Sequence, residues 1–573
     1  MTSDIAKRQR TVPSAKAFEF NWRRAVPDVL QKGAMFDRFD DETGTFEPDC
    51  FVRVDPDGFF IYWKTESSES QILELSQISD VRAGSKPKDE KLTAIIMERS
   101  PGKSWDRVVT ICSGLDLVNI TYTHMLAPDA ESATYWIQSL RFLTHNTKAA
   151  NVCPMTQLTK HWIRLTLTVN SKNKIPVRVI MKTFASGRNE RVIFQSLKEL
   201  GLPHGKNDDI EPSNFPFEKF YELYHKICPR TDVEDLFKSL SKNKEFLHVD
   251  KMIEFLNETQ RDPRLNEILY PFANRQTVKY IQENYETQEE YKNTDHLSIE
   301  CFYRYLMSDN NACVFLDRLD VYQEMDQPLS HYYINSSHNT YLIGRQFGGK
   351  SSVEIYRQVL LAGCRCIELD CWDGRGEDQE PIITHGKAMC TDILFKDVIY
   401  AIRDTAFVTS EYPVIMSFEN HCSKHQQYKL AKYCEDILGD MLLTRPIDGY
   451  PLEPGVPLPP PEKLKRKILI KNKRLKPEVE KQHLELFLKG QTDAIQEENE
   501  VAEDPDLTVD GEDGDGGTKC SNGENAVPSG DGGGSGPAPT ASSGGGSSAE
   551  LKRLQMKKVG PFSLRDLMYA TMY

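Results

Sequence analysis

Between residues 319 and 476, short apolar runs typical of β-strands alternate with longer runs typical of helices. The strand-like runs are HYYINSS (331–337), CRCIELDCW (364–372), EPIITHG (380–386), YPVIMSFENH (412–421) and RKILIKNKR (466–474). Helix-like runs cover residues 352–363, 391–407 and 425–439. Apolar strands separated by helices predict a parallel α/β sheet, and barrels of this kind carry their chemistry where the strands end.

The preceding segment, residues 18–147, is β-rich and follows a flexible start (1–17). Its strand-like runs are CFVRVD (50–55), GFFIYWK (58–64), LTAIIM (92–97), RVVTIC (107–112) and LVNITY (117–122), with a turn predicted at 55–58. A helix then follows near residues 129–146, which Asp129 can cap. Its predicted buried face is Ala133, Trp136, Ile137, Leu140 and Leu143. Strands closed by one amphipathic helix predict a small domain of the pleckstrin-homology (PH) type.

Residues 150–318 have helical periodicity throughout, clearest over 217–228, 233–240 and 252–258. Paired helices with twelve-residue loops are typical of EF-hands, but residues 239–250 (SLSKNKEFLHVD) lack the required carboxylates and the central glycine. We therefore predict an all-helical, EF-hand-like domain whose loop here does not bind calcium.

The acidity of the chain lies in one segment. The net charge is −14, and residues 491–550 hold fourteen Asp or Glu against one Lys, which leaves −1 for the rest. A near-neutral body lacks the basic face that nucleic-acid binding requires. Because residues 477–550 are acidic and rich in Gly and Ser, we predict a disordered linker there, followed by a short atypical tail (551–573).

The chain carries no run of about 20 apolar residues and no secretory signal at its start, and both facts predict a cytoplasmic protein. Its thirteen cysteines are irregularly spaced, so reduced thiols are expected.

Two carboxylates stand at the end of one predicted strand. Strand alternation puts Glu368 and Asp370 on the same face and sends Arg365 to the other. Glu419 follows the apolar residues PVIMSF (413–418) of another strand-like run, and Asn339 follows INSSH (334–338). Desolvated carboxylates need a compensating cation, and these four oxygen donors suit calcium or magnesium. The alternative is an ordinary salt-bridged surface pair.

Two histidines and two lysines also end strand-like runs. His338 and His385 suit acid–base or phosphate-stabilising roles, although a single histidine is more often a packing residue. Lys471 and Lys473 share a face and suit anion recognition, unless they are only solvated charge. A divalent ion with two His and two Lys indicates a phosphate substrate.

The runs HYYINSSHNTYL, GCRCIELDCWDG, EPIITHG, YPVIMSFENH and KILIKNK resemble, in order and spacing, the X half of the catalytic barrel of phosphoinositide-specific phospholipase C. Residues 18 to about 490 resemble the beta class of that family, of the beta-4 and photoreceptor type. The resemblance implies a PH-like domain (18–147), an EF-hand-like domain (150–318) and the X half of a TIM-type barrel (319–476). The Y half, which would complete the barrel, is expected after the linker, but only an unrelated stretch follows.

The resemblance also implies roles for individual residues. His338 and His385 match the catalytic histidines, Asn339, Glu368, Asp370 and Glu419 the calcium ligands, and Lys471 and Lys473 the residues that hold the ring phosphates. The implied reaction is calcium-dependent hydrolysis of phosphatidylinositol 4,5-bisphosphate to diacylglycerol and inositol trisphosphate. Attack of the inositol 2-hydroxyl on phosphorus forms a cyclic phosphate, and Glu368 is one candidate to accept the proton.

The implied partners are a phosphoinositide lipid at the inner face of the plasma membrane, a Gαq-type G protein and a Rho-family GTPase, without nucleic acid. One alternative is a non-catalytic regulatory chain that lacks the Y half. A glycerophosphodiester-cleaving barrel is another, but it does not account for the upstream domains.

Overall fold

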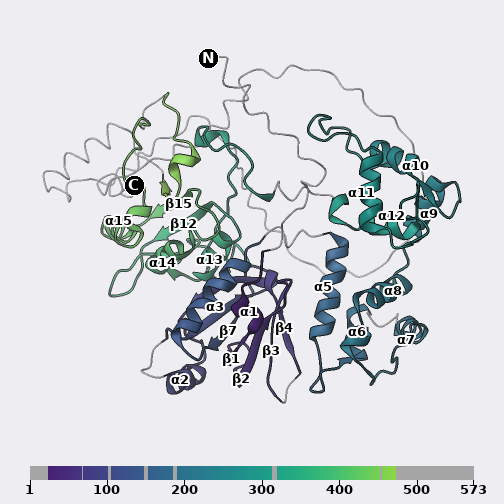
Figure 1. The fold of residues 1–573 in the computed structure, drawn as a ribbon. Helices are drawn as coiled ribbons and strands as arrows, with labels where there is room; N and C mark the ends of the chain where they lie inside the picture. The colour runs from purple at the N-terminus through teal and green to yellow at the C-terminus, as the bar shows by residue number, and fades with distance from the viewer. Residues whose placement is uncertain are drawn as a thin grey trace, which may run out of the picture. The chain divides into compact units, whose positions relative to one another are not determined.

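The computed structural model describes residues 24–66, 69–100, 105–146, 153–184, 190–312, 319–451 and 455–472. The predicted flexible start, the acidic linker and the short tail lie outside these ranges, and so does Lys473. The chain divides after Gln323 into two compact units, and Figure 1 shows a purple sheet and blue to teal helices in the first and a green α/β fold in the second. None of the helices in the described ranges is long and apolar enough to cross a bilayer.

The first unit begins with a seven-stranded antiparallel sheet in the order β4-β3-β2-β1-β7-β6-β5. The strands are β1 (Ala34–Asp40), β2 (Thr45–Val54), β3 (Phe60–Lys64), β4 (Gln71–Glu74), β5 (Ile78–Ala83), β6 (Val108–Ser113) and β7 (Thr121–Leu126). A short helix, α1 (Asp28–Lys32), precedes them. The predicted closing helix is α3 (Ala130–Leu143), whose start is capped by the Asp129 carboxylate accepting from the Ser132 amide at 2.7 Å. All five predicted core residues of α3 are buried, which confirms the sequence pattern.

One predicted strand is wrong, and another is correct only at its last two residues. LTAIIM (92–97) lies in a helix, α2 (Glu90–Arg99), because Asp89 caps its first turn and Leu92 and Ile96, four residues apart, pack together against the sheet. LVNITY (117–122) is a turn for most of its length, since the Asp116 carboxylate accepts the amides of Val118 and Asn119, and β7 starts only at Thr121. In both places a local carboxylate overrides β-branched composition.

The turn predicted at residues 55–58 is present and is built around a buried carboxylate. Asp55 is 1 % exposed, and its side chain accepts the backbone amides of Asp57, Phe59 and Phe60 at 2.6–2.9 Å. The amide of Gly58 completes the turn by donating to the Asp55 carbonyl. Burial is the largest influence on Asp55 and raises the pKa of its carboxyl. This turn sets the β2–β3 connection.

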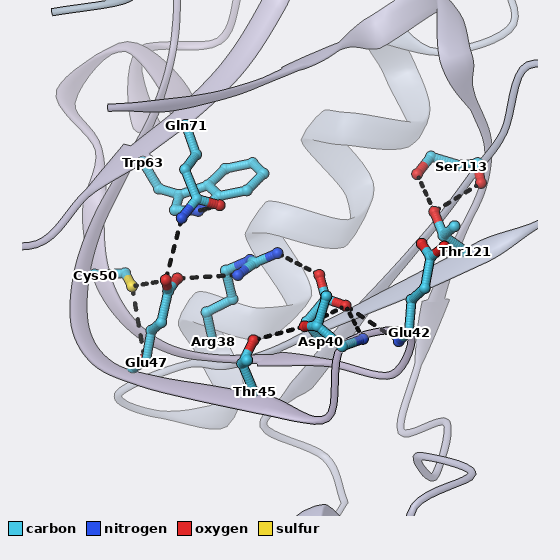
Figure 2. Close-up of polar contacts among 11 residues, drawn as sticks. Arg38, Asp40, Glu42, Thr45, Glu47, Cys50, Trp63, Gln71, Ser113 and Thr121 are labelled. Atoms are coloured by element: carbon cyan, nitrogen blue, oxygen red, sulfur yellow. Dashed lines mark hydrogen bonds and ion pairs between the residues drawn. The ribbon is translucent and has the colours of Figure 1, made fainter. Parts of the chain in front are cut away.

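A polar cluster surrounds Arg38 of β1, as Figure 2 shows. The Arg38 guanidinium is buried, donates to Asp40 at 2.5 Å and to Glu47 at 2.9 Å, and lies 4.8 Å from the centre of the Trp63 ring. Gln71 joins the cluster by donating to Glu47 at 3.1 Å. Two carboxylates therefore compensate this one cation, which leaves little positive charge here for a phosphate.

The helical part of the first unit consists of eight helices within the described ranges. They are α5 (Pro154–Leu167), α6 (Val177–Phe184), α7 (Glu190–Glu199), α8 (Phe217–Ile227), α9 (Thr231–Ser241), α10 (Val249–Glu254), α11 (Arg275–Tyr285) and α12 (Ile299–Leu306). The helix predicted over 252–258 ends early as an α-helix, and Phe255–Thr259 forms a π-helical turn. Short antiparallel bridges, β8 (Ile175–Pro176) with β9 (Asp209–Ile210) and β10 (Leu247–His248) with β11 (His296–Leu297), join paired loops as in EF-hands. The absence of calcium from loop 239–250 stays a prediction.

Helix α5 packs on the sheet within this unit. Ile163 of α5 is buried with Phe59 and Phe60, and the amide of Ser70 donates to the carbonyl of Val169 at 3.1 Å. Beside them Lys160 of α5, 8 % exposed, pairs with Glu74 at the end of β4. The sheet and α5 therefore contact each other through an apolar cluster, a backbone hydrogen bond and a largely buried ion pair.

The second unit is a five-stranded sheet in the order β14-β13-β12-β15-β16. Its elements are α13 (Glu354–Leu361), β12 (Cys366–Trp372), β13 (Ile382–Ile383), β14 (Ile393–Leu394), α14 (Phe395–Thr405), β15 (Val414–His421), α15 (Lys424–Leu438) and β16 (Ile468–Lys471). Strands β12, β15 and β16 are parallel, and the three helices pack on them in one apolar core, as predicted for the first half of a TIM-type barrel.

Two details of this sheet differ from the prediction. The run 331–337 is not a continuous strand: only Ser336 bridges to Cys366, although the Asn335 carbonyl also accepts from the amides of Arg365 and Cys366. The run 380–386 forms β13, which is antiparallel to β12, because the loop after β12 returns directly without a crossover helix. The described cysteines are all free thiols, as expected.

Candidate active site

Strand β12 separates its side chains as predicted. Ile367, Leu369 and Cys371 are fully buried in the apolar core, whereas Glu368 and Asp370 point to the other face. Arg365 does not pair with these carboxylates: its guanidinium donates to the carbonyls of Ala406, Tyr412 and Leu360. The surface salt-bridge alternative is therefore wrong for this pair.

Asn339 lies directly over Glu368. Its backbone is left-handed, with φ 43°, which Asn tolerates better than most residues. This conformation lets its amide donate to the Glu368 carboxylate at 2.7 Å. The neighbouring Thr340 hydroxyl accepts from the Glu368 backbone amide at 3.0 Å, so two hydrogen bonds to Glu368 fix the segment carrying His338 and Asn339 to β12.

The carboxylate of Asp370 is buried, and only one of its two oxygens accepts a hydrogen bond from the described residues. The Tyr341 hydroxyl donates to its Oδ2 at 2.5 Å, while its Oδ1 finds no donor among the described residues. Burial, which is the largest influence, and the nearby charges of Glu419 and Glu368 together raise the pKa of Asp370 to about 6, against the opposing effect of the Tyr341 hydrogen bond. An unpartnered, buried carboxylate oxygen beside two other acids indicates a place for a cation.

His385 lies beside Asn339 because β13, which precedes it, runs antiparallel to β12. The Thr384 amide donates to the Asp370 carbonyl, and His385 follows immediately. The Nδ1 of His385 lies 2.6 Å from the Gln346 carbonyl, and its Nε2 lies 3.4 Å from the side-chain nitrogen of Asn339. A half-buried histidine is thus held beside a predicted metal ligand, with Nε2 facing the site.

Glu419 and Lys471 come from the next two parallel strands. Glu419 pairs in register with Asp370, its side chain is half exposed, and one carboxylate oxygen lies 3.9 Å from Nε2 of His421. Lys471 pairs in register with Ser417, and its ammonium donates to that hydroxyl at 3.2 Å. Parallel register therefore places both side chains at neighbouring strand ends.

His338 directly precedes Asn339 and is exposed to solvent. Lys473 lies outside the described residues. The structure therefore brings Asn339, Glu368, Asp370 and His385 into one hydrogen-bonded and electrostatic group and adds Glu419 and Lys471 on the adjoining strands.

The oxygen-bearing side chains of Asn339, Glu368, Asp370 and Glu419 are chemically suited to a hard divalent cation. Carboxylate and amide oxygens are the ligands that calcium prefers, and the Asp370 Oδ1 is unsatisfied by protein donors in the described chain. No cluster of three His, Cys, Asp or Glu side chains preformed for a metal occurs within those ranges. A cation here would be held by Asn339 and the acids together.

Sequence reasoning missed several residues that build the site. Tyr341 holds Asp370, Ser417 holds Lys471, and the loop residue Gln346 contacts both Asn339 and His385. Tyr341 lies within the NTYL motif, so its position could have been noticed. Gln346 carried no signal, because it is a polar residue in an irregular loop.

Four family models match consecutive parts of the chain. Residues 325–474 match the phosphatidylinositol-specific phospholipase C X domain, and residues 25–151 match a PH domain. Residues 158–228 match the phosphoinositide phospholipase C beta1-4-like EF-hand domain, and residues 223–315 match the EF-hand-like region of phosphoinositide-specific phospholipase C. With the half-barrel and its strand-end residues, these matches show that the chain belongs to the phosphoinositide-specific phospholipase C family.

Within that family the chain is similar to beta-class members. It is 62 % identical over 476 residues to the human 1-phosphatidylinositol 4,5-bisphosphate phosphodiesterase beta-4, covering 82 % of this chain and 40 % of that protein. It is 56 % identical to a Drosophila melanogaster 1-phosphatidylinositol 4,5-bisphosphate phosphodiesterase, covering 83 % and 44 %. The crystal structure of S. officinalis PLC21 matches with a TM-score of 0.73 at 42 % identity, covering 83 % and 62 %. The chain thus spans about two fifths of the length of these sequence relatives.

Proposed function

We propose that this chain carries catalytic residues for calcium-dependent hydrolysis of phosphatidylinositol 4,5-bisphosphate to diacylglycerol and inositol trisphosphate. The observation that supports this most directly is the group formed by Asn339, Glu368, Asp370 and His385, in which a buried carboxylate oxygen has no protein donor in the described chain. The names of the sequence relatives support the choice of substrate.

The reaction proceeds in two steps. The inositol 2-hydroxyl attacks the adjacent phosphorus, the bond from phosphorus to the diacylglycerol oxygen breaks, and water then opens the cyclic phosphate. Glu368 accepts the hydroxyl proton, His385 supplies a proton from Nε2 to the leaving oxygen, and His338 stabilises charge on the phosphoryl oxygens. Lys471 and Lys473 hold the ring phosphates.

Asn339, Glu368, Asp370 and Glu419 would hold the calcium ion, which would supply a lowered pKa of the attacking hydroxyl and compensation of phosphoryl charge. The protein contributes the arrangement of these ligands. Tyr341 restrains Asp370, and the backbone amide of Asn339 restrains Glu368, so both carboxylates keep a fixed direction before substrate arrives.

Two exposed apolar side chains beside the site support action at a membrane surface. Phe347 is 65 % exposed and Met389 is 76 % exposed, on adjacent loops joined by the Gly348 amide donating to the Ala388 carbonyl at 2.8 Å. We propose that these loops touch the lipid surface while the headgroup enters the site, as expected of a peripheral protein at the inner face of the plasma membrane. Control by a Gαq-type G protein and a Rho-family GTPase is proposed from the family resemblance alone.

The first test measures release of soluble inositol phosphate from vesicles containing phosphatidylinositol 4,5-bisphosphate, using the full 573-residue chain. We expect release that needs calcium and is lost in His338→Ala and in His385→Ala. The matched control is His425→Ala, an exposed histidine of α15, which retains release. Release that persists without His338 and His385 contradicts the proposed roles, and no release by the unchanged chain contradicts the proposed activity.

A further inference from the structure

We propose that Gln346 is a positioning residue of this site, which orients both the amide of Asn339 and the ring of His385. The inference rests on the proposed function, because its purpose is to prepare a calcium ligand and a proton donor. Gln346 does so with two different groups: its side-chain Oε1 accepts from the Asn339 side-chain nitrogen at 2.7 Å, and its backbone carbonyl lies 2.6 Å from His385 Nδ1.

The contact with the side-chain amide decides which end of Asn339 is available to a cation. An Asn side chain has two N–H donors on one side and a carbonyl oxygen on the other. One donor meets Gln346 Oε1, and the other faces His385 Nε2 at 3.4 Å. Both neighbours are acceptors, so the nitrogen is held toward them. The Asn339 oxygen is therefore left for a metal ion.

The contact with the carbonyl decides the tautomer of His385. A carbonyl oxygen can only accept, so His385 Nδ1 must carry a hydrogen, and the neutral ring leaves its lone pair on Nε2. In the substrate-free site that lone pair is the partner of the Asn339 donor, and Nε2 supplies a proton to the leaving oxygen only after the ring has taken one up from solvent. The two contacts of Gln346 therefore support each other through Asn339 and His385.

The loop that carries Gln346 is held in place on both sides. The Gly348 amide donates to the Ala388 carbonyl, and the Thr391 amide donates to the Gly349 carbonyl at 3.1 Å. A Cβ at position 349 would lie 2.0 Å from the Arg345 carbonyl oxygen, so only glycine fits this bend. The loop is therefore a defined support for the Gln346 contacts.

The experiment compares calcium binding by the full chain with that of two variants at position 346, using calcium chloride alone in calorimetric titration. Gln346→Met keeps the length of the side chain but removes the acceptor, and we expect a loss of about 10- to 100-fold in calcium affinity, as found for residues that orient metal ligands. Gln346→Glu keeps an oxygen acceptor and is expected to retain the affinity. Gln327→Met, at an exposed glutamine of the same unit, is the matched control and is expected to bind like the unchanged chain.

A second readout separates positioning from a general loss of structure. In the inositol phosphate assay, Gln346→Met should lower kcat more than it raises KM, with rescue in Gln346→Glu. Equal calcium affinity in Gln346→Met and the unchanged chain would overturn the role of Gln346 while leaving the proposed function standing. Absence of calcium binding by the unchanged chain would overturn both.

Discussion

At the scale of single residues, the buried carboxylate of the site lowers the free energy of unfolding when no cation is bound. Asp370 is 5 % exposed, has one oxygen without a donor among the described residues, and lies near Glu368 and Glu419. Burial and the neighbouring negative charges disfavour the ionised form of such a carboxylate. The free energy of unfolding should therefore depend on pH through this group.

Asp370→Asn tests this cost. The unfolded pKa is near 3.9 and the folded pKa is raised to about 6, so the folded chain holds this proton more tightly and loses stability as pH rises from about 4 to 6. Above that window the ionised group costs on the order of 3 kcal/mol. We expect Asp370→Asn to melt several degrees higher than the unchanged chain at pH 7.5 in EDTA, with no difference at pH 4. Scanning calorimetry measures both, and an equal difference at both pH values would show that Asp370 is not the cause.

At the scale of elements, the antiparallel return of β13 and the loop over residues 344–349 create the mouth of the site. Together they carry His385, Gln346 and the two exposed apolar tips at Phe347 and Met389. A continuous parallel sheet would have placed the residues after β13 at a different edge. The antiparallel return of β13 therefore places the site residues next to the loops that we propose to touch the lipid surface.

The apolar tips give a second prediction. Burying a Phe or Met side chain is worth about 1.5–3 kcal/mol, so the double change Phe347→Ser and Met389→Ser should weaken binding to phosphoinositide vesicles by at least about tenfold. Sedimentation with vesicles measures the effect. Val408→Ser, at an exposed position after α14, is the control and should bind normally. An equal loss in the control would indicate a general effect of apolar surface.

At the scale of the molecule, the chain forms two compact units, and the first combines the PH domain and the EF-hand-like helices. The interface within that unit includes the ion pair of Lys160 with Glu74, beside the apolar contact of Ile163 with Phe59 and Phe60. A largely buried pair is costly to break, because the remaining charge is then left without compensation.

A double-mutant cycle tests whether the ion pair of Lys160 with Glu74 stabilises the contact between the PH domain and the EF-hand-like helices. Lys160→Met alone should destabilise the first unit by about 3 kcal/mol, since it leaves Glu74 partly buried without its partner. Adding Glu74→Leu should recover most of the loss, because an apolar pair replaces the ionic one. Urea unfolding of the three variants and the unchanged chain measures the coupling. Additive effects of the two changes would show that Lys160 and Glu74 do not interact in solution.

Much of the fold was readable from the sequence because its signals are local. Helix α3 was predicted with its cap and all five buried residues, and the faces of β12 followed from strand alternation. Local composition failed where a side chain redirected the backbone, as Asp89 does at the start of α2 and Asp116 does before β7.

The sequence by itself determined the order of the domains, the family and the candidate site residues, since strand alternation, helical periodicity and long motifs are properties of short stretches of chain. Only the tertiary structure decided which of those residues meet. The antiparallel direction of β13, the contacts of Gln346 and the unpartnered oxygen of Asp370 all depend on residues separated by many positions in the chain. No local pattern encodes such distances, because they arise when the strands and loops pack together.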